Sequence, residues 1–375
     1  MKFVQANKAY LPHIGGVETI VRQLGEGMAR EPGTSSAVVA CSDEPRTSHR
    51  AVAGVDVTLA GTVTRVKSLP ISPSFTRCLL KHEGDVLLAH EPFLLTGLVY
   101  ATRRGRVRRR FKNLVVWWHS DIVRQSAMRT AFVPLQRALL QEASAIVVAT
   151  PRHIDSSNYL QEFRDKCRVI PFGIDPARFT LTESIERRIA AIRAAYPGPI
   201  VLFSGRLVYY KGAEYLVRAM ESLPNVQLVM IGRGPLKEEL HGLAAKGSGN
   251  VHFLDHLSEP ELVAYYHAAD VFVLPSVENS EAFGIVQLEA MVCGKPVITC
   301  DLPTGVNYVN QDGKTGIVVP KRDYKALEGA ISRLVNDNDL RHRLGEYARD
   351  RVLREFSETT MVKSVYNLCR DLTTN

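Results

Sequence analysis

The chain has 375 residues, of which 45% are hydrophobic and 23% charged, and its formal net charge is +8. This length exceeds the roughly 250–300 residues at which a single hydrophobic core stops growing, so we expect two domains. The composition argues against long disordered stretches, and no apolar run reaches the roughly 20 residues of a membrane-spanning helix. The six cysteines form no C-x-x-C pair, which predicts reduced, cytosolic thiols and no zinc site.

From the N-terminus, short runs rich in Val, Ile and Leu alternate with amphipathic stretches. Residues 1–7 carry too short an apolar run for a signal peptide and predict the first strand, at 2–7. Further strands are expected at 37–42, 85–90, 113–119 and 145–150, and helices are clearest at 17–30 and 134–143. Apolar strands separated by helices indicate a parallel sheet covered on both faces. Residues 1–176 are therefore predicted to form a doubly wound, Rossmann-like α/β domain.

The alternation breaks in a charged segment, 183–193, which ends at Pro197-Gly198-Pro199 and which we interpret as a hinge. It then resumes with strands expected at 200–204, 227–231, 251–254, 271–275 and 296–299. Helices are expected at 213–222, 236–245, 259–268 and 283–293. A second Rossmann-like domain is thus predicted over 177–356. Residues 357–375 predict a last helix that can pack on either domain, and we favour the first.

Open α/β sheets bind ligands beyond the carboxyl ends of their strands. Two such domains in tandem are therefore expected to face a cleft that holds the site. In the second domain, we expect a helix to begin near Phe283 with Ser280 as its cap, so that Glu281 lies at its start and Glu289 two turns inside it. The N–H groups expected to receive phosphate oxygens at this helix start are those of Phe283, Gly284 and Ile285. Two carboxylates beside a phosphate could bind sugar and ribose hydroxyls, although first-turn and helix-face glutamates are also common without any ligand.

Arg206 and Lys211 bracket a turn after the first strand of the second domain. Two permanent cations at this place could reach a diphosphate, Arg with bidentate geometry and Lys as a point charge, and could stabilise its departure without a metal ion. A solvated pair is the alternative. Gly232, in an incomplete dinucleotide fingerprint, is expected near the nucleotide base.

Two further candidates lie in the first domain. Gly15 and Gly16 follow the first strand and would let the backbone approach a phosphate closely, or would simply make a tight turn. His119 follows the strand expected at 113–119, and a histidine at the carboxyl end of a strand would face the ligand and could bind a sugar hydroxyl.

The frame E-x-F-G-I-x-x-x-E-A-M at 281–291, followed by G-x-P-V-I, resembles the retaining GT-B glycosyltransferases of family four, and the resemblance covers most of the chain. It implies that Glu281 contacts the donor sugar and Glu289 the ribose of the nucleotide. The frame G-R-x-x-x-x-K-G places the family's cations on Arg206 and Lys211. The frame G-G-x-E at 15–18 implies backbone contacts to donor phosphate or acceptor, and the family's sugar-binding histidine corresponds to His119.

The longer string H-S-D-I-V-R-Q at 119–125, with P-F-G-I at 171–174, S-E-A-F-G-I at 280–285 and V-N-Q at 309–311, is similar to bacterial mannosyltransferases that build polysaccharides on lipid carriers. The resemblance implies transfer of mannose from GDP-mannose to a polyprenyl-diphosphate-linked saccharide, with retention and without metal or cofactor. A UDP-sugar-dependent transferase of glucose or N-acetylglucosamine, and a GT-B sugar-nucleotide epimerase, remain as alternatives.

The excess positive charge is concentrated in one segment after the apolar stretch 93–100. We call this segment the basic cluster; its members are Arg103, Arg104, Arg106, Arg108, Arg109, Arg110 and Lys112. Anionic lipid attracts basic residues by about 1 kcal/mol each near the surface. We therefore expect a cytoplasmic protein held peripherally at the inner face of the cell membrane, a solvated loop being the alternative. The alternative outside enzymes is a nucleic-acid-binding protein that uses the basic cluster. Phe111 is the only aromatic residue between the basic ones, and no nucleic-acid-binding module is recognised in the sequence, so no nucleic-acid partner is expected.

Overall fold

The structure is a computed structural model that describes residues 1–13, 15–66, 69–120 and 126–374. The chain divides into two compact units. Unit 1 consists of Met1–Gly173 together with Glu358–Asn375, and unit 2 consists of Ile174–Ser357. Within the described ranges, no helix has both the length and the apolarity needed to cross a bilayer.

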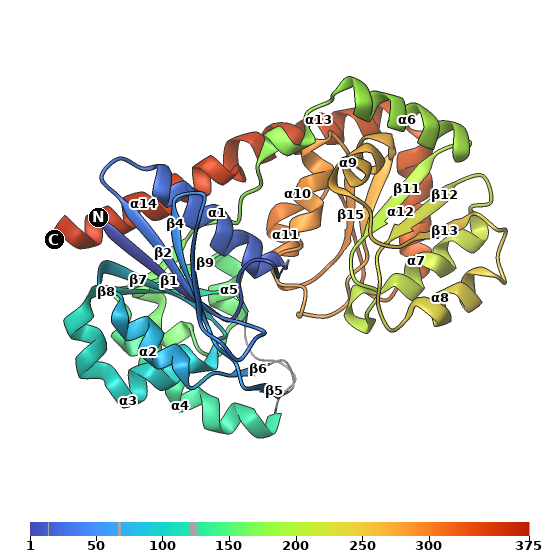
Figure 1. Ribbon diagram of the computed structural model, residues 1–375. Helices are drawn as coiled ribbons and strands as arrows, with labels where there is room; N and C mark the ends of the chain where they lie inside the picture. Colours follow the sequence, from blue (N-terminus) through green and yellow to red (C-terminus); the bar gives the residue numbers. More distant parts are fainter. Residues whose placement is uncertain (14, 67–68, 121–125, 375) are drawn as a thin grey trace. The chain divides into compact units, whose positions relative to one another are not determined.

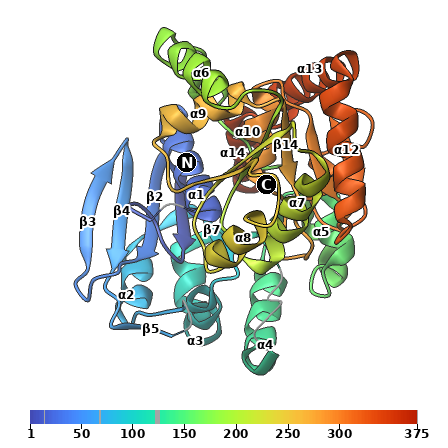
Figure 2. The same cartoon turned by 90° about the vertical axis from the view of Figure 1, so that its right-hand side faces the viewer.

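Unit 1 is built on an eight-stranded sheet with the order β10-β9-β8-β7-β1-β2-β4-β3. Its strands are β1 (Lys2–Asn7), β2 (Ser35–Cys41), β3 (Ser48–Val52), β4 (Val55–Ala60), β7 (Gly84–Glu91), β8 (Phe111–Trp118), β9 (Ala145–Val148) and β10 (Cys167–Val169). All neighbours pair in parallel except β3, which returns antiparallel along β4 at one edge (Figure 2). A separate pair, β5 (Thr64–Val66) and β6 (Leu69–Ile71), is also antiparallel. The order changes direction between β1 and β7.

Helices cover both faces of this sheet (Figure 1). One face carries α1 (Gly16–Arg30) and α14 (Glu358–Thr374), and the other carries α2 (Ser74–Lys81), α3 (Leu94–Arg110) and α4 (Ser126–Glu142). The larger apolar core fills the space under α2, α3 and α4. Short helical segments, α5 (Pro151–Ser156) and η1 (Gln161–Lys166), precede β10.

Unit 2 has a six-stranded, wholly parallel sheet with the order β13-β12-β11-β14-β15-β16. Its strands are β11 (Ile200–Ser204), β12 (Gln227–Ile231), β13 (Val251–Leu254), β14 (Val271–Leu274), β15 (Val297–Cys300) and β16 (Gly316–Val319). The two doubly wound α/β units confirm the predicted fold class.

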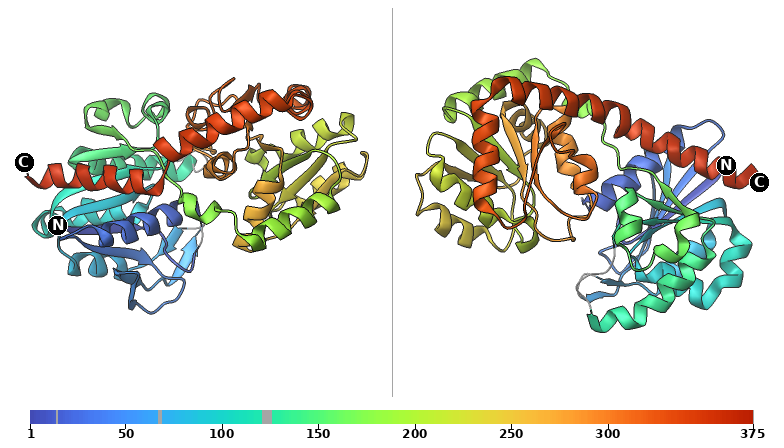
Figure 3. Two further views of the ribbon diagram at one scale, coloured as in Figure 1. Left: turned by 90° about the horizontal axis from the view of Figure 1, so that it is seen from above. Right: turned by 180° about the vertical axis from the view of Figure 1, so that it is seen from behind.

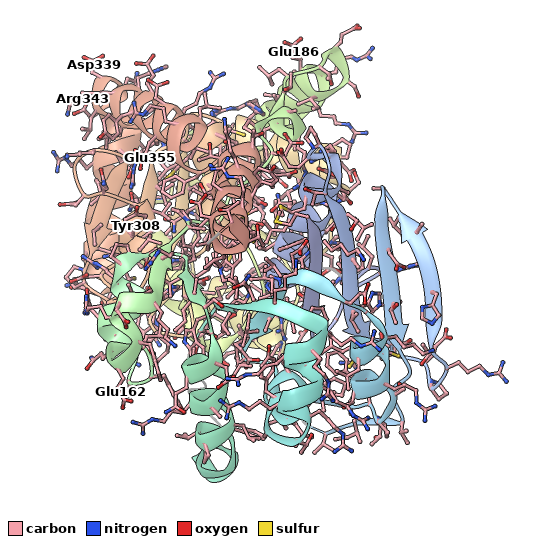
Figure 4. All side chains as sticks on the ribbon, turned by 90° about the vertical axis from the view of Figure 1, so that its left-hand side faces the viewer. Glu162, Glu186, Tyr308, Asp339, Arg343 and Glu355 are labelled. Carbon is pink, nitrogen blue, oxygen red and sulfur yellow. The ribbon has the colours of Figure 1, made fainter. Side chains whose placement is uncertain are left out.

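The helices of unit 2 are α6 (Glu183–Ala195), α7 (Ala213–Ala219), α8 (Lys237–Ala244), α9 (Glu259–Ala268), α10 (Ile285–Val292), α11 (Val306–Val309), α12 (Tyr324–Asn336) and α13 (Asn338–Glu355). Short 3-10 turns are η2 (Pro176–Phe179), η3 (Tyr209–Lys211) and η4 (Met220–Ser222). Helices α7, α8 and α12 share one core with the sheet, α6 packs on α9, and α10 contacts α9 and α13. The outer sides of α6 and α13 are polar, as the exposed Glu186, Asp339 and Arg343 show (Figure 4).

Three local expectations need correction. The charged segment 183–193 is not a hinge: it forms α6, begins with Thr182 as N-cap and belongs to unit 2. The helix expected near Phe283 begins at Ile285, and its N-cap is Gly284 rather than Ser280. The arginines of the basic cluster do not follow a separate apolar helix, because they share α3 with the apolar stretch, and Arg103 has non-helical backbone angles there. Lys112 lies in β8.

Helix α14 returns to unit 1 and lies beside α1 (Figure 3, left). The Arg30 guanidinium lies 3.2 Å from the Glu358 carboxylate, and Asn113 donates a hydrogen bond to the carbonyl of Leu372. Gly27 allows the two helices to approach closely, since a Cβ there would lie 2.5 Å from a methyl group of Val362.

We predict that Gly27→Ala loosens α14. Overpacking of this kind costs about 1–3 kcal/mol, and the cost falls on the contact between α1 and α14. Amide hydrogen exchange in α14 should therefore accelerate. The control is Gly105→Ala in α3, where a Cβ meets nothing within 4 Å and where alanine favours the helix by about 0.5–1 kcal/mol. Unchanged exchange in α14 of the Gly27 variant would contradict this packing.

Candidate functional site

The carboxyl edge of the sheet in unit 2 brings together the two strongest sequence motifs. Strands β11 and β14 are neighbours, yet β12 lies on the far side of β11 and β15 on the far side of β14. The loops after β11 and β14 therefore diverge at a topological switch point, where open α/β sheets bind ligands. Arg206 and Lys211 follow β11, and Glu281 follows β14.

Lys211 and Glu281 form a buried ion pair at this switch point. The Lys211 Nζ lies 2.5 Å from the Glu281 Oε2, and both side chains are about nine-tenths buried. The hydroxyl of Ser276 donates to the same carboxylate oxygen over 2.9 Å. A main-chain hydrogen bond from Val277 N–H to the carbonyl of Tyr210 joins the same two loops. Because a buried pair is little screened by solvent, it fixes both loops in register.

The loop after Glu281 leads into α10 through Gly284, whose left-handed backbone, with φ of 70°, suits glycine. The N–H groups of Ile285 and Val286 have no acceptor within the helix, so they can receive an anion. The side chain of Phe283 is buried and its ring packs on Phe356, 6.2 Å between centroids. Any ligand contact of Phe283 must therefore come from its main chain.

The ring of Phe356 is itself held in place from α11 and α13. The Arg351 guanidinium lies over the rings of Tyr308 and Phe356, at 5.6 and 5.0 Å from their centroids, and donates to the carboxylate of Glu355. The carbonyl of Ala282 also accepts from Gly305, at the N-terminus of α11. The loop that carries Glu281 thus rests on a rigid base.

Arg206 and Gly232 differ in how accessible they are. Arg206 is exposed, and among the described residues its guanidinium has no carboxylate partner, so it is available to a ligand. Gly232 donates its N–H to the carbonyl of Leu254, and a Cβ there would collide with the carbonyl of Gly205. Close packing of two loops therefore explains this glycine without a nucleotide.

Glu289 lies one turn inside α10, where its carboxylate accepts a hydrogen bond of 2.6 Å from the hydroxyl of Tyr266 on α9. Burial raises the pKa of Glu289 and raises the pKa of Tyr266 well above its ordinary value. The sequence did not point to Tyr266, because an aromatic residue in an apolar helix reads as core. Only its position beside Glu289 in the fold shows its role in orienting that carboxylate.

In unit 1, His119 follows β8 and is buried, with its Nε2 2.9 Å from the Nδ1 of His90. His90 in turn has its Nε2 2.9 Å from the Oε1 of Gln5. Burial lowers the pKa of His90 to about 3. Burial also lowers the pKa of His119 well below its ordinary value, and His90 and His153 add to this effect. Both rings are therefore neutral near pH 7. Among the described residues, the Nδ1 of His119 has no hydrogen-bond partner.

Gly15 and Gly16 lie at the start of α1, after β1. Gly15 is the N-cap with an extended backbone, and a Cβ there would collide with the carboxylate of Glu18, which folds back over the helix start. An acidic side chain already complements the dipole at this point. Ile14, next to these glycines, and residues 121–125 of the string that begins at His119 lie outside the described residues.

Intramolecular ion pairs divide the basic cluster. Arg104 and Arg108 both contact the carboxylate of Glu142. Arg110 lies 3.7 Å from Glu83, and Lys112 lies 2.7 Å from Asp85. The remaining members, which have no carboxylate partner among the described residues, are Arg103, Arg106 and Arg109. All seven side chains are exposed.

Among the residues that the structure describes, no three His, Cys, Asp or Glu side chains gather in a way that could hold a metal ion. Lys211, Arg206 and the start of α10 are the groups at the unit 2 site that can meet a diphosphate. Glu281 and Glu289 are the carboxylates there that can accept hydrogen bonds from hydroxyls.

The chain was compared with known proteins. The family model described as Glycosyltransferase Family 4 matches residues 14–178, and the model described as Glycosyl transferases group 1 matches residues 185–351. The O-antigen chain mannosyltransferase C of Escherichia coli is 31% identical over 98% of each chain. The D-rhamnosyltransferase WbpZ of Pseudomonas aeruginosa is 32% identical over 95% of this chain and 92% of that protein. Among solved structures, sucrose-phosphate synthase of Thermosynechococcus elongatus matches with a TM-score of 0.81 and 25% identity, covering 100% of this chain and 99% of the other.

Proposed function

Because this chain belongs to glycosyltransferase family 4 and has the GT-B fold, we propose that it transfers mannose, with retention, from GDP-mannose to a lipid-carrier-linked saccharide in bacterial polysaccharide assembly. The observation that carries this proposal is the junction of β11 and β14. There the buried pair of Lys211 and Glu281 lies at the same edge of the sheet as the exposed Arg206 and the start of α10.

The donor diphosphate binds at this junction. Its charge attracts Lys211 and Arg206, and its oxygens accept hydrogen bonds from the first N–H groups of α10. The arriving diphosphate competes with Glu281 for Lys211, and the released Glu281 carboxylate then accepts hydrogen bonds from the sugar. Glu289, oriented by Tyr266, binds the ribose.

In this transfer reaction the enzyme stabilises the leaving diphosphate and does not supply a nucleophile of its own. The acceptor hydroxyl attacks the anomeric carbon from the face that the diphosphate leaves, and its proton passes to the departing phosphate oxygen. The anomeric configuration is therefore kept. Arg206 and Lys211 offset the charge that develops on the diphosphate, a role that a divalent metal fills elsewhere.

The choice of mannose rests on the names of the two relatives. One is a mannosyltransferase and the other a D-rhamnosyltransferase, and each aligns over more than nine-tenths of this chain. D-rhamnose is mannose without the hydroxyl at carbon 6, so both sugars share the configuration of the ring. A donor of the manno configuration is common to both.

The acceptor side rests on the O-antigen relative and on the basic cluster. A saccharide on a polyprenyl diphosphate is presented at the membrane surface, and exposed arginines on α3 can hold unit 1 there by attraction to anionic lipid. We therefore propose that the enzyme works at the inner face of the cell membrane.

We predict that GDP-mannose stabilises the protein more than other nucleotide sugars and is turned over fastest in the presence of EDTA. A ligand at a hundred times its Kd stabilises by about 2.7 kcal/mol, which a thermal-shift panel resolves. The panel contains GDP-mannose, GDP-D-rhamnose, UDP-glucose and UDP-N-acetylglucosamine. Faster turnover of a UDP-sugar would refute the donor assignment.

The same assay tests two further points. Loss of activity on chelation, restored by Mg²⁺ or Mn²⁺, would refute metal independence. Conversion of the donor without an acceptor would indicate an epimerase.

We predict that replacing Arg103, Arg106 and Arg109 by glutamine weakens flotation with phosphatidylglycerol vesicles by on the order of 10²-fold at low salt, because each free cation contributes about 1 kcal/mol. The control replaces Arg104 and Arg108, which Glu142 already neutralises in part, and should lose less. Equal recovery with neutral and anionic vesicles would leave the cluster without a membrane role.

A further inference from the structure

A line of hydrogen bonds crosses three neighbouring strands of unit 1. Gln5 lies on β1, His90 on β7 and His119 directly after β8, and the sheet order places β7 between the other two. Three polar contacts make up the line. The Nε2 of Gln5 donates to the carbonyl of Val21 in α1 over 2.9 Å, and the Oε1 of Gln5 lies 2.9 Å from the Nε2 of His90. The Nδ1 of His90 lies 2.9 Å from the Nε2 of His119, and the line ends at the Nδ1 of His119.

The carbonyl of Val21 sets the direction of every bond in this line. A carbonyl oxygen only accepts, so the amide nitrogen of Gln5 must face it and the amide oxygen must face His90. That oxygen also only accepts, so the Nε2 of His90 carries a proton. A neutral imidazole carries one proton, so the Nδ1 of His90 is bare and accepts from the Nε2 of His119.

The last atom of the line is therefore a bare acceptor. The Nδ1 of His119 is buried, and no described residue donates to it. The ring cannot turn over to hide this nitrogen without breaking the bond to His90. It also lies nearly parallel to the rings of Trp117 and Phe172, with centroids 5.8 and 5.5 Å away and interplanar angles of 4° and 20°. A buried acceptor without a donor costs free energy, so the site favours a ligand that donates.

We propose that Gln5 and His90 are positioning residues that hold His119 in the Nε2–H tautomer, so that its Nδ1 accepts a hydrogen bond from a substrate hydroxyl. The proposal deepens the proposed function, on which it rests for the statement that this hydroxyl belongs to a sugar. It also sets a selection rule. A hydroxyl can donate to this nitrogen, whereas a phosphate dianion, a carboxylate or a carbonyl cannot.

The neutral state of the line has a physical cause. The titratable groups near His119 are His90 and His153, and protonation of any of the three would add a charge beside two other rings in a buried place. Protonation of His90 would also turn its Nδ1 into a donor facing the N–H of His119. The tautomers are therefore expected to stay fixed across the pH range in which a free histidine titrates.

The tautomers can be read directly in the substrate-free protein by long-range proton–nitrogen NMR with ¹⁵N-labelled histidine. We expect His90 and His119 to show protons on Nε2 alone, unchanged between about pH 6 and 8, the range around the ordinary histidine pKa. A proton on the Nδ1 of His119, or titration of its ring in this range, would overturn the proposal whatever reaction the enzyme catalyses.

Two variants at one position separate the polarity of His90 from its bulk. His90→Phe fills the space but offers no acceptor, so His119 should lose its single tautomer and turnover should fall about 10–100-fold, as when a partner that orients a histidine is removed. His90→Gln supplies an amide N–H toward Gln5 and an oxygen toward His119, so it should restore the tautomer and most of the turnover. Equal turnover in the two variants would overturn the role of the line.

This design keeps two failures apart. The expected tautomers in a protein that turns over no nucleotide sugar would contradict the proposed function and leave the hydrogen-bond line standing. Normal turnover of GDP-mannose with a mobile or Nδ1-protonated His119 would contradict the hydrogen-bond line and leave the proposed function standing.

Discussion

The ion pair between Lys211 and Glu281 is the interaction on which the proposed site depends. It joins the loop after β11 to the loop after β14, two strands that are adjacent in the sheet but about 70 residues apart in the chain. A buried pair is held only when its geometry and its other hydrogen bonds are good, and here Ser276 supplies one more bond to the carboxylate. Both charges are thereby held at the place where we propose that the donor diphosphate binds.

The candidate site in unit 1 consists of neutral groups instead of charged ones. A diphosphate carries charge, and the groups of unit 2 that suit it are cations and a helix start. A sugar hydroxyl is neutral, so it is recognised by a hydrogen-bond acceptor that is held in one orientation. The line from Gln5 to His119 provides this direction without any charge, because a backbone carbonyl at one end decides the polarity of every bond. Each unit by itself thus offers groups that suit one part of the proposed donor.

Much of the fold could be predicted from the sequence, and particular elements show the physical reasons. Strands β11 and β12 are mainly apolar because they are buried in the sheet, and the predicted bounds of β11, β12 and β13 agree with the structure. Strand β3 escaped prediction because it is an exposed edge strand without apolar residues in alternation. The sequence predicts a hinge where the structure has α6, because many charges are typical of a solvated helix face and of a linker alike.

The candidate site also has a part that could be predicted from the sequence and a part that could not. Arg206, Lys211, Glu281 and Glu289 stand in short frames whose spacing is visible along the chain. The pairing of Lys211 with Glu281, and the partners Tyr266, Ser276, Gln5 and His90, depend on strand order and on neighbouring helices, which no local spacing records.

The most direct test of the account is the affinity for GDP, without sugar or acceptor, measured by calorimetry on Lys211→Met and Glu281→Gln. If the diphosphate competes with Glu281 for Lys211, the lysine variant should bind GDP more weakly than the unmodified enzyme. The glutamine variant should bind GDP more tightly while its turnover of the nucleotide sugar falls by on the order of 10²–10³-fold. Weaker GDP binding in both variants, or unchanged binding in the lysine variant, would contradict the claim that this ion pair opens to receive the donor diphosphate.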